Sequence, residues 1–246
     1  TNHTELRCEL TSSSHGGTRR VRVRVADLYG HGNFSYAAPT IDNVTTTDTE
    51  GGLVTIRGSS FGLAGAAVHI GETLCQGVSY LVPHSVIACR VGASAAPLDG
   101  LNVTLELSGA HGQGSFSYAP PRITSVSSTG TAGGNVTIRG ASFGVSRNIT
   151  VGGRPCTVHT SSHSEIVCRV GAGTGGGHDV LVRTGVGDGQ GVFSYAPPSI
   201  TSVSSVGTAG GVVTIVGENL GANKSAINVS IGSSPCEVVT INHTNA

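Results

Sequence analysis

Apolar and polar side chains alternate over short windows along the whole chain. The segments Val21–Val25 and Val103–Leu107 both place an apolar residue at every second position. A period of two, bounded by Gly, Ser and Pro, predicts half-buried β-strands, because successive side chains of a strand point to opposite faces of a sheet. No window of the sequence keeps a helical period. The pattern therefore predicts an all-β chain.

One order of signals recurs along the chain. It opens with Phe-Ser-Tyr-Ala at Phe34, Phe116 and Phe193, at intervals of 82 and 77 residues, and continues with Pro and an Ile-x-x-Val pair. A Gly-Gly step, a Val-Thr-Ile strand pattern and a Phe-Gly or Leu-Gly step follow, and the cysteines keep the same period. We therefore expect two partial and two complete repeats: the closing part of one (1–38), two complete copies (39–119 and 120–196), and the opening part of another (197–246).

The cysteines of the complete repeats are spaced for disulfides. Several short strands with turn signals between them predict a small Greek-key β-sandwich. A domain this small buries too little surface to be stable on its core alone, so we expect a covalent cross-link. Cys75 and Cys89 lie 14 positions apart, and Cys156 and Cys168 lie 12 apart, a spacing that one antiparallel hairpin can bring together. A metal site or redox pair is the alternative, but the sequence has no Cys-x-x-Cys. We expect disulfides and hence an oxidising compartment.

Potential N-glycosylation sites are unusually dense. Nine of the eleven asparagines open an Asn-x-Ser/Thr triplet: Asn2, Asn33, Asn43, Asn102, Asn135, Asn148, Asn223, Asn228 and Asn242. Chance in a Thr-rich β protein is the alternative to glycosylation of a secreted eukaryotic chain. In six triplets the middle residue is apolar, so on a strand it points inward while the asparagine points outward. We expect a sugar coat on sheet faces and loops.

Three segments carry a family resemblance. Pro39–Gly62, Pro121–Gly144 and Pro198–Gly221 resemble the IPT/TIG domain family, and the resemblance covers essentially the whole chain. It implies tandem immunoglobulin-like β-sandwiches. Arrays in that family occur in ectodomains of plexin-like and growth-factor-receptor proteins and in amoebal adhesion proteins. Single copies occur in Rel-type transcription factors and some starch-acting enzymes, so the fold alone does not choose the function.

Composition narrows the function classes. Fourteen basic and fourteen acidic residues cancel, and only 11% of the chain is charged, which argues against partners such as nucleic acid or an anionic membrane. The sequence has no run of 18 apolar residues, so we expect no membrane insertion in this segment. It opens without a charged-then-apolar signal segment, which indicates a mature piece or an internal fragment.

Motifs that resemble catalytic sites are better explained as turns. Gly58–Gly62 and Gly140–Gly144 fit Gly-x-Ser-x-Gly, but the third copy, Gly217–Gly221, has no serine there. Gly171–Gly176 fits Gly-x-Gly-x-x-Gly, yet no helical pattern follows, and a flexible hairpin loop is expected. The ten histidines are scattered. We expect no catalytic residue, no metal site and no cofactor beyond covalent glycans.

One charged stripe stands out in the opening partial repeat. Arg20, Arg22 and Arg24 share the outward face of a predicted strand. A solvated strand face is the default interpretation, and contact with acidic glycans or a protein partner is the alternative.

The two partial repeats complement each other. Residues 1–38 contain the second cysteine of a repeat, Cys8, and residues 197–246 contain the first, Cys236. The segment is either cut from a longer array, or the tail part of one chain docks the head part of the next and builds a filament. Fusing the ends separates these cysteines by 18 positions, and a six-residue overlap restores 12. Cys8 and Cys236 are therefore expected to pair with a neighbouring chain or repeat.

These observations favour a structural extracellular glycoprotein. Short Ala-Pro joints between repeats predict a rigid tandem array. We expect heavy N-glycosylation and head-to-tail assembly with copies of itself into a fibril or surface coat, with other cell-surface glycoproteins as further partners. The alternative is a cell-surface receptor or adhesion ectodomain that binds a protein partner.

Overall fold

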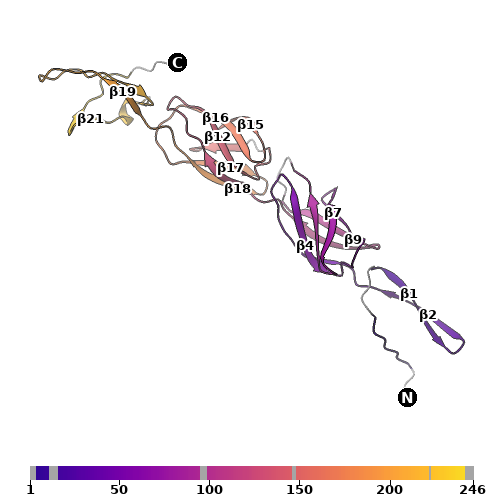
Figure 1. Ribbon diagram of the computed structural model, residues 1–246. Coiled ribbons are helices and arrows are strands. Elements are labelled where there is room, and N and C mark those ends of the chain that lie inside the picture. Colours follow the sequence, from indigo (N-terminus) through magenta and orange to yellow (C-terminus); the bar gives the residue numbers. More distant parts are fainter. Residues whose placement is uncertain (1–3, 11–15, 95–98, 146–147, 222, 242–246) are drawn as a thin grey trace. The chain divides into compact units, whose positions relative to one another are not determined.

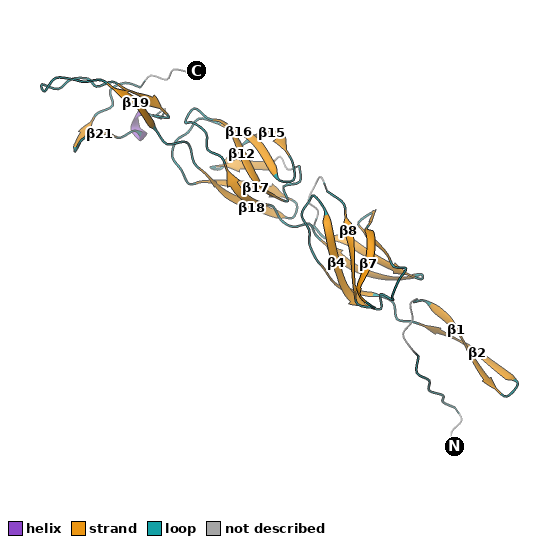
Figure 2. Ribbon diagram, viewed as in Figure 1, coloured by secondary structure: helices purple, strands orange, loops and turns teal. Residues whose placement is uncertain are grey.

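The fold is built almost entirely from strands. The computed structural model describes residues 4–10, 16–94, 99–145, 148–221 and 223–241. Within this part of the chain the helical structure is a single short 3₁₀ turn, η1 (Lys224–Ala226), and antiparallel strands form the sheets (Figure 2). Contacts divide the chain into two compact units, the first running to Ala119 and the second from Pro120.

The first unit opens with a two-stranded hairpin. Strand β1 (Thr18–Val25) pairs with β2 (Leu28–Ser35) from Thr18↔Ser35 to Val25↔Leu28. Every residue of both strands is exposed, including those at apolar positions of the alternating pattern. The hairpin is therefore a regular two-stranded sheet with no covered face.

A complete sandwich of two four-stranded sheets follows in the first unit (Figure 1). One sheet has the order β3-β4-β8-β7, the other β10-β9-β5-β6, and all neighbours are antiparallel. The strands are β3 (Thr40–Val44), β4 (Gly52–Ser59), β5 (Ala67–Ile70), β6 (Thr73–Leu74), β7 (Gln76–Val82), β8 (Val86–Val91), β9 (Leu101–Leu107) and β10 (Ala110–Phe116).

The core of this sandwich lies between the two sheets. Val54 and Ile56 of β4 and Val103 and Leu105 of β9 are fully buried, and polar or exposed residues alternate with them. Phe61, just after β4, is also fully buried. The period of two seen in the sequence thus separates a core face from a solvent face, as expected for a half-buried strand.

The second unit contains a sandwich with the same plan. Its sheets have the orders β11-β12-β16-β15 and β14-β13-β17-β18. Val136, Ile138 and Phe143 repeat the buried positions of the first sandwich. The strands are β11 (Arg122–Val126), β12 (Gly134–Ala141), β13 (Asn148–Val151), β14 (Arg154–Pro155), β15 (Thr157–Ser161), β16 (Glu165–Val170), β17 (His178–Thr184) and β18 (Gly187–Phe193). The predicted all-β, immunoglobulin-like fold is confirmed.

The second unit ends with two small two-stranded sheets. Strand β19 (Ser199–Val203) pairs with β20 (Ile215–Glu218), and β21 (Val229–Ile231) pairs with β22 (Ser234–Cys236). By position in the repeat, they correspond to β3–β4 and β5–β6 of the first sandwich.

Glycines mark fixed places in each repeat for two physical reasons. Gly51, in the first Gly-Gly step, has φ +82°, and Gly133 in the second repeat has the same value. This left-handed region is open to glycine without a Cβ clash. Gly58 lies against Thr40, and a Cβ at Gly58 would overlap the Thr40 carbonyl oxygen. The same approach recurs at Gly140 and Gly217, so the turn glycines hold β3-type strands close to β4-type strands.

Candidate functional site

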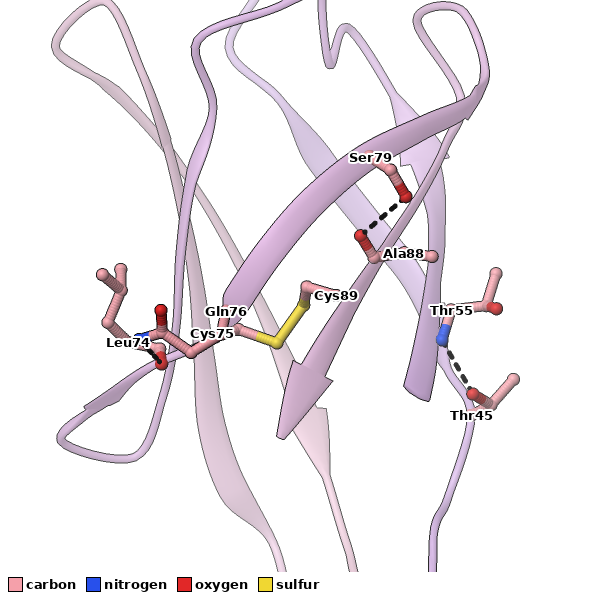
Figure 3. Close-up of a disulfide and its surroundings, with 8 residues drawn as sticks. All are labelled: Thr45, Thr55, Leu74, Cys75, Gln76, Ser79, Ala88 and Cys89. Atoms are coloured by element: carbon pink, nitrogen blue, oxygen red, sulfur yellow. Dashed lines mark hydrogen bonds between the residues drawn. A yellow bond between two sulfur atoms is a disulfide. The ribbon is translucent and has the colours of Figure 1, made fainter. Parts of the chain in front are cut away.

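A disulfide is buried in the first sandwich (Figure 3). Cys75 directly precedes β7 and Cys89 lies on β8, and these two strands form one antiparallel hairpin. The structure joins the two cysteines with a Cα–Cα distance of 5.7 Å, and they are 3% and 0% exposed. Close by, the Ser79 hydroxyl donates to the Ala88 carbonyl oxygen across the same hairpin.

The second sandwich repeats this bond. Cys156 precedes β15, Cys168 lies on β16, and their Cα atoms are 5.5 Å apart. Both disulfides join positions whose spacing predicted them. Disulfides persist in oxidising environments, so the two bonds indicate a secreted or surface location.

Two thiols remain free, one before and one after the two complete sandwiches along the chain. Cys8 is exposed and Cys236 is half-buried at the end of β22. By position in the repeat, Cys236 corresponds to Cys75, the first cysteine of a pair, and Cys8 corresponds to Cys89, the second. Each partial repeat therefore holds one member of a pair that is bonded in both complete repeats.

The opening partial repeat, residues 4–38, leaves core positions uncovered. Val21 and Val23 of β1 correspond to Val103 and Leu105 of β9 in the hairpin register. The first two are 40% and 39% exposed, whereas the second two are 0% exposed. We call this uncovered side of β1 and β2 the head face. Phe34 on the same face is 39% exposed, where its counterpart Phe116 is 1% exposed.

The closing partial repeat, residues 197–241, also leaves core positions uncovered. Val213 and Ile215 are only half-buried, although their counterparts Val54 and Ile56 are fully buried. Ile200 on β19 is 62% exposed. We call this uncovered side of β19–β22 the tail face. Within the described residues, every buried apolar side chain lies between Pro39 and Phe193, in the two complete repeats.

The sequons present their asparagines to solvent wherever the structure describes them. Asn2 and Asn242 lie outside the described residues, and the other seven are exposed: Asn33, Asn43, Asn102, Asn135, Asn148, Asn223 and Asn228. On β9, β12 and β13 the middle residue of the triplet is buried while the asparagine before it is exposed. Strand alternation thus leaves these amide groups accessible to a glycosylating enzyme.

The catalytic-type motifs fall at connections between strands. Ser60 and Ser142 follow β4 and β12 in left-handed turns, each with φ +60°, and the described residues after them continue without a helix. The loop Gly171–Gly176 was expected to be a hairpin, and this is wrong. It joins β16 to β17, which belong to different sheets. The Tyr195 hydroxyl donates to the Gly171 carbonyl oxygen at 2.8 Å and anchors the start of this crossover.

One histidine recurs at the same place in each repeat, as His3, His84, His163 and His243, and in the complete repeats it acts through its backbone. The amide of Phe61 donates to the His84 carbonyl oxygen, and the amide of Phe143 donates to the His163 carbonyl oxygen. His3 and His243 lie outside the described residues. Within the described residues, no group of three or more His, Cys, Asp or Glu side chains is placed to hold a metal ion. Its helical structure is too short and polar to cross a bilayer.

The arginine stripe lies on the side of β1 opposite the head face, and it contacts an aromatic ring that the sequence pattern did not identify. The Arg22 guanidinium carbon lies 3.8 Å from the centre of the Tyr29 ring. Arg24 contacts the same ring at 5.6 Å and pairs with Asp27 at 3.7 Å. The sequence feature from which this contact could have been predicted is the two-residue turn Ala26–Asp27. This turn fixes the hairpin register and places Tyr29 opposite Arg24.

The chain matches the family described as IPT/TIG domain over residues 39–118, 121–196 and 198–246. It is 26% identical to Fibrocystin-L of Mus musculus, an alignment that covers 98% of this chain and 6% of that protein. It is 24% identical to Contact site A protein of Dictyostelium discoideum, over 99% of this chain and 52% of the relative. The chain thus spans at most about half the length of these relatives. The solved I9–I11 tandem of titin is 12% identical, with a TM-score of 0.29 and coverage of 75% of each chain.

Proposed function

Because the chain belongs to the IPT/TIG domain family, we propose that it is an extracellular structural glycoprotein whose copies assemble head to tail. The tail face of one copy is completed by the head face of the next, which restores a full sandwich at each junction. The observation that carries the proposal is the pair of uncovered faces, since each has the core positions that the other lacks. A contact between two different surfaces of one molecule propagates into a fibre when it does not close.

The complete sandwiches supply the register of this junction. In the first, β4 pairs with β8 so that Val54 lies opposite Cys89 and Ile56 opposite Ile87. Applied to the partial repeats, the same register places Val213 opposite Cys8 and Ile215 opposite Leu6. Leu6 is 71% exposed in the single copy, so this pairing removes a large apolar side chain from water.

The second sheet follows the same template. In the first sandwich, β5 pairs with β9, with Val68 opposite Leu105 and Ile70 opposite Val103. The corresponding junction pairs are Val229 with Val23 and Ile231 with Val21. The head hairpin thereby becomes the inner strand and one edge strand of a four-stranded sheet, and the edge of β21 is paired.

A disulfide locks the junction in this proposal. The register brings Cys236 beside Cys8, as Cys75 lies beside Cys89. The two thiols lose two protons and two electrons as the S–S bond forms, and a small-molecule disulfide such as oxidised glutathione takes up the electrons. Each junction then carries the same staple as a complete repeat.

N-glycosylation belongs to the same proposal. The seven described sequon asparagines are exposed, and those on β9, β12 and β13 lie on the solvent side of their strands. Glycans there cover outward sheet faces and supply the solubility that a chain without net charge otherwise lacks. Intact mass before and after endoglycosidase treatment of protein from a eukaryotic secretory host tests this part. An unshifted mass would contradict it.

The assembly is tested on the full 246-residue chain by sedimentation and electron microscopy in oxidising buffer. We expect linear oligomers that non-reducing electrophoresis resolves into a disulfide-linked ladder. Val23→Asp charges the head face and is expected to give monomers. Leu53→Asp is the matched control, because Leu53 is already 58% exposed on a complete repeat. Monomers of the unmodified chain at tens of micromolar, or equal disruption by both variants, contradict the proposal.

The second candidate is an adhesion ectodomain that binds a different surface protein. It is favoured by the match to Contact site A protein over 99% of this chain, since the name of that relative refers to contact sites. A chain that stays monomeric and coats beads that then bind to cells, but not to each other, supports this candidate over self-assembly.

A further inference from the structure

The outward side of the head hairpin carries a cationic surface that neither the fold nor the assembly uses. We define the arginine face as Arg20, Arg22 and Arg24 of β1 together with Tyr29 and His31 of β2. In the hairpin register Arg22 lies opposite His31 and Arg24 opposite Tyr29. All five are exposed, and they lie on the side of the hairpin opposite the head face, so completion of the sandwich leaves them in solvent.

The complete repeats show that the fold does not require arginine here. The position of Arg20 is taken by Asn102 in the first sandwich and Asp179 in the second. The position of Arg22 is taken by Thr104 and Leu181. The position of Arg24 is taken by Glu106 in the first sandwich and by a single arginine, Arg183, in the second. Strands β9 and β17 form the same hairpin with these residues, so the cluster of arginines is specific to the head hairpin.

The charges of the arginine face are poorly neutralised. Four of the fourteen basic residues of a chain with no net charge lie within residues 19–24, and Asp27 is the one carboxylate within residues 16–38. Asp27 reaches only Arg24, at 3.7 Å, and its side chain is 99% exposed. Within the described residues, Arg20 and Arg22 have no ion-pair partner. Like charges on one strand face repel, so an external anion is favoured there.

The geometry suits a polyanion better than a single anion. Alternate residues of a strand lie about 6.6 Å apart, so the three guanidinium groups form a row along β1. The Arg22 guanidinium carbon lies over the Tyr29 ring, 3.8 Å from its centre, and this contact restrains the group, whose N–H edge has no ion-pair partner within the described residues. Such an edge binds sulfate or carboxylate through two parallel hydrogen bonds.

We propose that the arginine face binds a linear anionic polysaccharide, with sulfate or carboxylate groups on successive sugars meeting the three arginines in turn. The sequon at Asn33 favours this class over a folded acidic protein. Asn33 lies opposite Arg20 at the base of the hairpin, so a glycan there flanks the row, and this argument rests on the proposed glycosylation. A thin polysaccharide chain passes beside this glycan along β1, whereas a folded protein is wide enough to collide with it.

The test measures binding of the full glycosylated chain to immobilised heparin and to dextran sulfate, with uncharged dextran and poly-glutamate for comparison. We expect saturable binding to both sulfated chains at 0.15 M NaCl, and little to dextran or poly-glutamate. The triple variant Arg20→Asn, Arg22→Thr, Arg24→Thr is expected to bind at least tenfold more weakly, with a salt dependence reduced by about three ionic contacts.

Two controls separate this face from overall charge. Arg57→Thr, Arg90→Thr, Arg122→Thr removes three exposed arginines from the complete repeats and is expected to change binding less than about twofold, as surface charges away from a site do. Arg19→Thr removes a charge from the opposite side of β1 and is expected to behave the same way. Equal losses in either control, or equal binding to poly-glutamate or dextran, overturn the proposal.

Weaker binding of the triple variant could also result from an unfolded hairpin, so a variant that is expected to bind more tightly provides an independent test. Asp27→Asn deletes the one carboxylate beside the row, so it is expected to tighten heparin binding by about twofold and to raise the NaCl concentration at elution. Unchanged or weaker binding of Asp27→Asn contradicts the assignment. Self-assembly is scored separately by sedimentation, so a chain that binds heparin as a monomer supports this inference while it rejects the head-to-tail proposal.

Discussion

The Tyr118 hydroxyl donates a 2.8 Å hydrogen bond to the carbonyl oxygen of Gly92. Gly92 follows β8 and Tyr118 follows β10, so the bond ties the end of one sheet to the end of the other. The second sandwich repeats this bond between Tyr195 and Gly171. The recurring Phe-Ser-Tyr-Ala signal therefore contributes a core phenylalanine and an inter-sheet tie.

Tyr118→Phe is expected to destabilise the first sandwich by about 1 kcal/mol at neutral pH, the usual contribution of one hydrogen bond. Burial raises the pKa of Tyr118 above its ordinary value of 10.0. The unfolded chain then ionises first, so stability is full below pH 10 and is lost as pH rises toward the higher folded pKa. Phenylalanine removes this part of the alkaline loss. Denaturant unfolding of both proteins between pH 8 and 11 checks this, and parallel curves contradict it.

Loss of one buried disulfide is expected to destabilise its own repeat. In the chain-entropy account, a loop of about 15 residues is worth about 3 kcal/mol, and the bond between Cys75 and Cys89 closes a loop of this size. The double variant Cys75→Ala, Cys89→Ala should raise hydrogen exchange in β4 and β8 but leave β12 and β16 protected. The matching variant of Cys156 and Cys168 should show the reverse pattern. Uniform loss of protection in both sandwiches would argue against this independence.

Gly58→Ala is expected to cost several kcal/mol or to prevent folding of the first sandwich. A Cβ at this position overlaps the Thr40 carbonyl oxygen, and backbone cannot move aside as a flexible side chain can. Gly32→Ala is the control, because a Cβ there has no neighbour within 4 Å, and it should change stability by less than about 0.5 kcal/mol. Thermal unfolding of the two variants distinguishes these outcomes, and equal shifts would refute the steric account.

Phe116→Ala and Phe34→Ala should differ strongly although the two residues hold the same place in the repeat. Phe116 is 1% exposed, so its truncation is expected to cost about 3–5 kcal/mol through lost burial and a cavity. Phe34 is 39% exposed, so its truncation should cost far less in monomers. If the head face becomes buried at a junction, Phe34→Ala should weaken oligomers without lowering the melting temperature of the complete repeats. Sedimentation and calorimetry of the same samples measure both effects.

Sequence periodicity predicted which side of each strand is apolar, but not whether that side is covered. Val103 and Leu105 lie in a core, whereas Val21 and Val23, with the same alternation, remain exposed. The difference comes from the opposing strands, which are present in a complete repeat and absent from the head hairpin. Alternation predicts which face of a strand is apolar. Whether that face is buried depends on a second sheet, which the local sequence pattern does not specify.

Local composition likewise did not define the partner of a strand. The glycine-rich loop Gly171–Gly176 has the residues of a hairpin, yet it carries the chain from one sheet to the other. Glycine permits many backbone paths, and pairing is decided by which apolar faces meet. The spacing of Cys75 and Cys89 was more informative, because those cysteines belong to a true hairpin of β7 and β8. The contact between Arg22 and Tyr29 needed the cross-strand register.

The buried disulfides also limit how far each complete repeat can be stretched. Cys75 and Cys89 lie 14 positions apart, and the segment between them spans about 50 Å when fully extended. With the S–S bond intact, a pulling force is transmitted through the disulfide from one cysteine to the other. The segment between the two cysteines therefore cannot be extended. A repeat that ruptures under tension lengthens by correspondingly less, and β7 stays tethered to β8, ready to re-form the hairpin when the load falls.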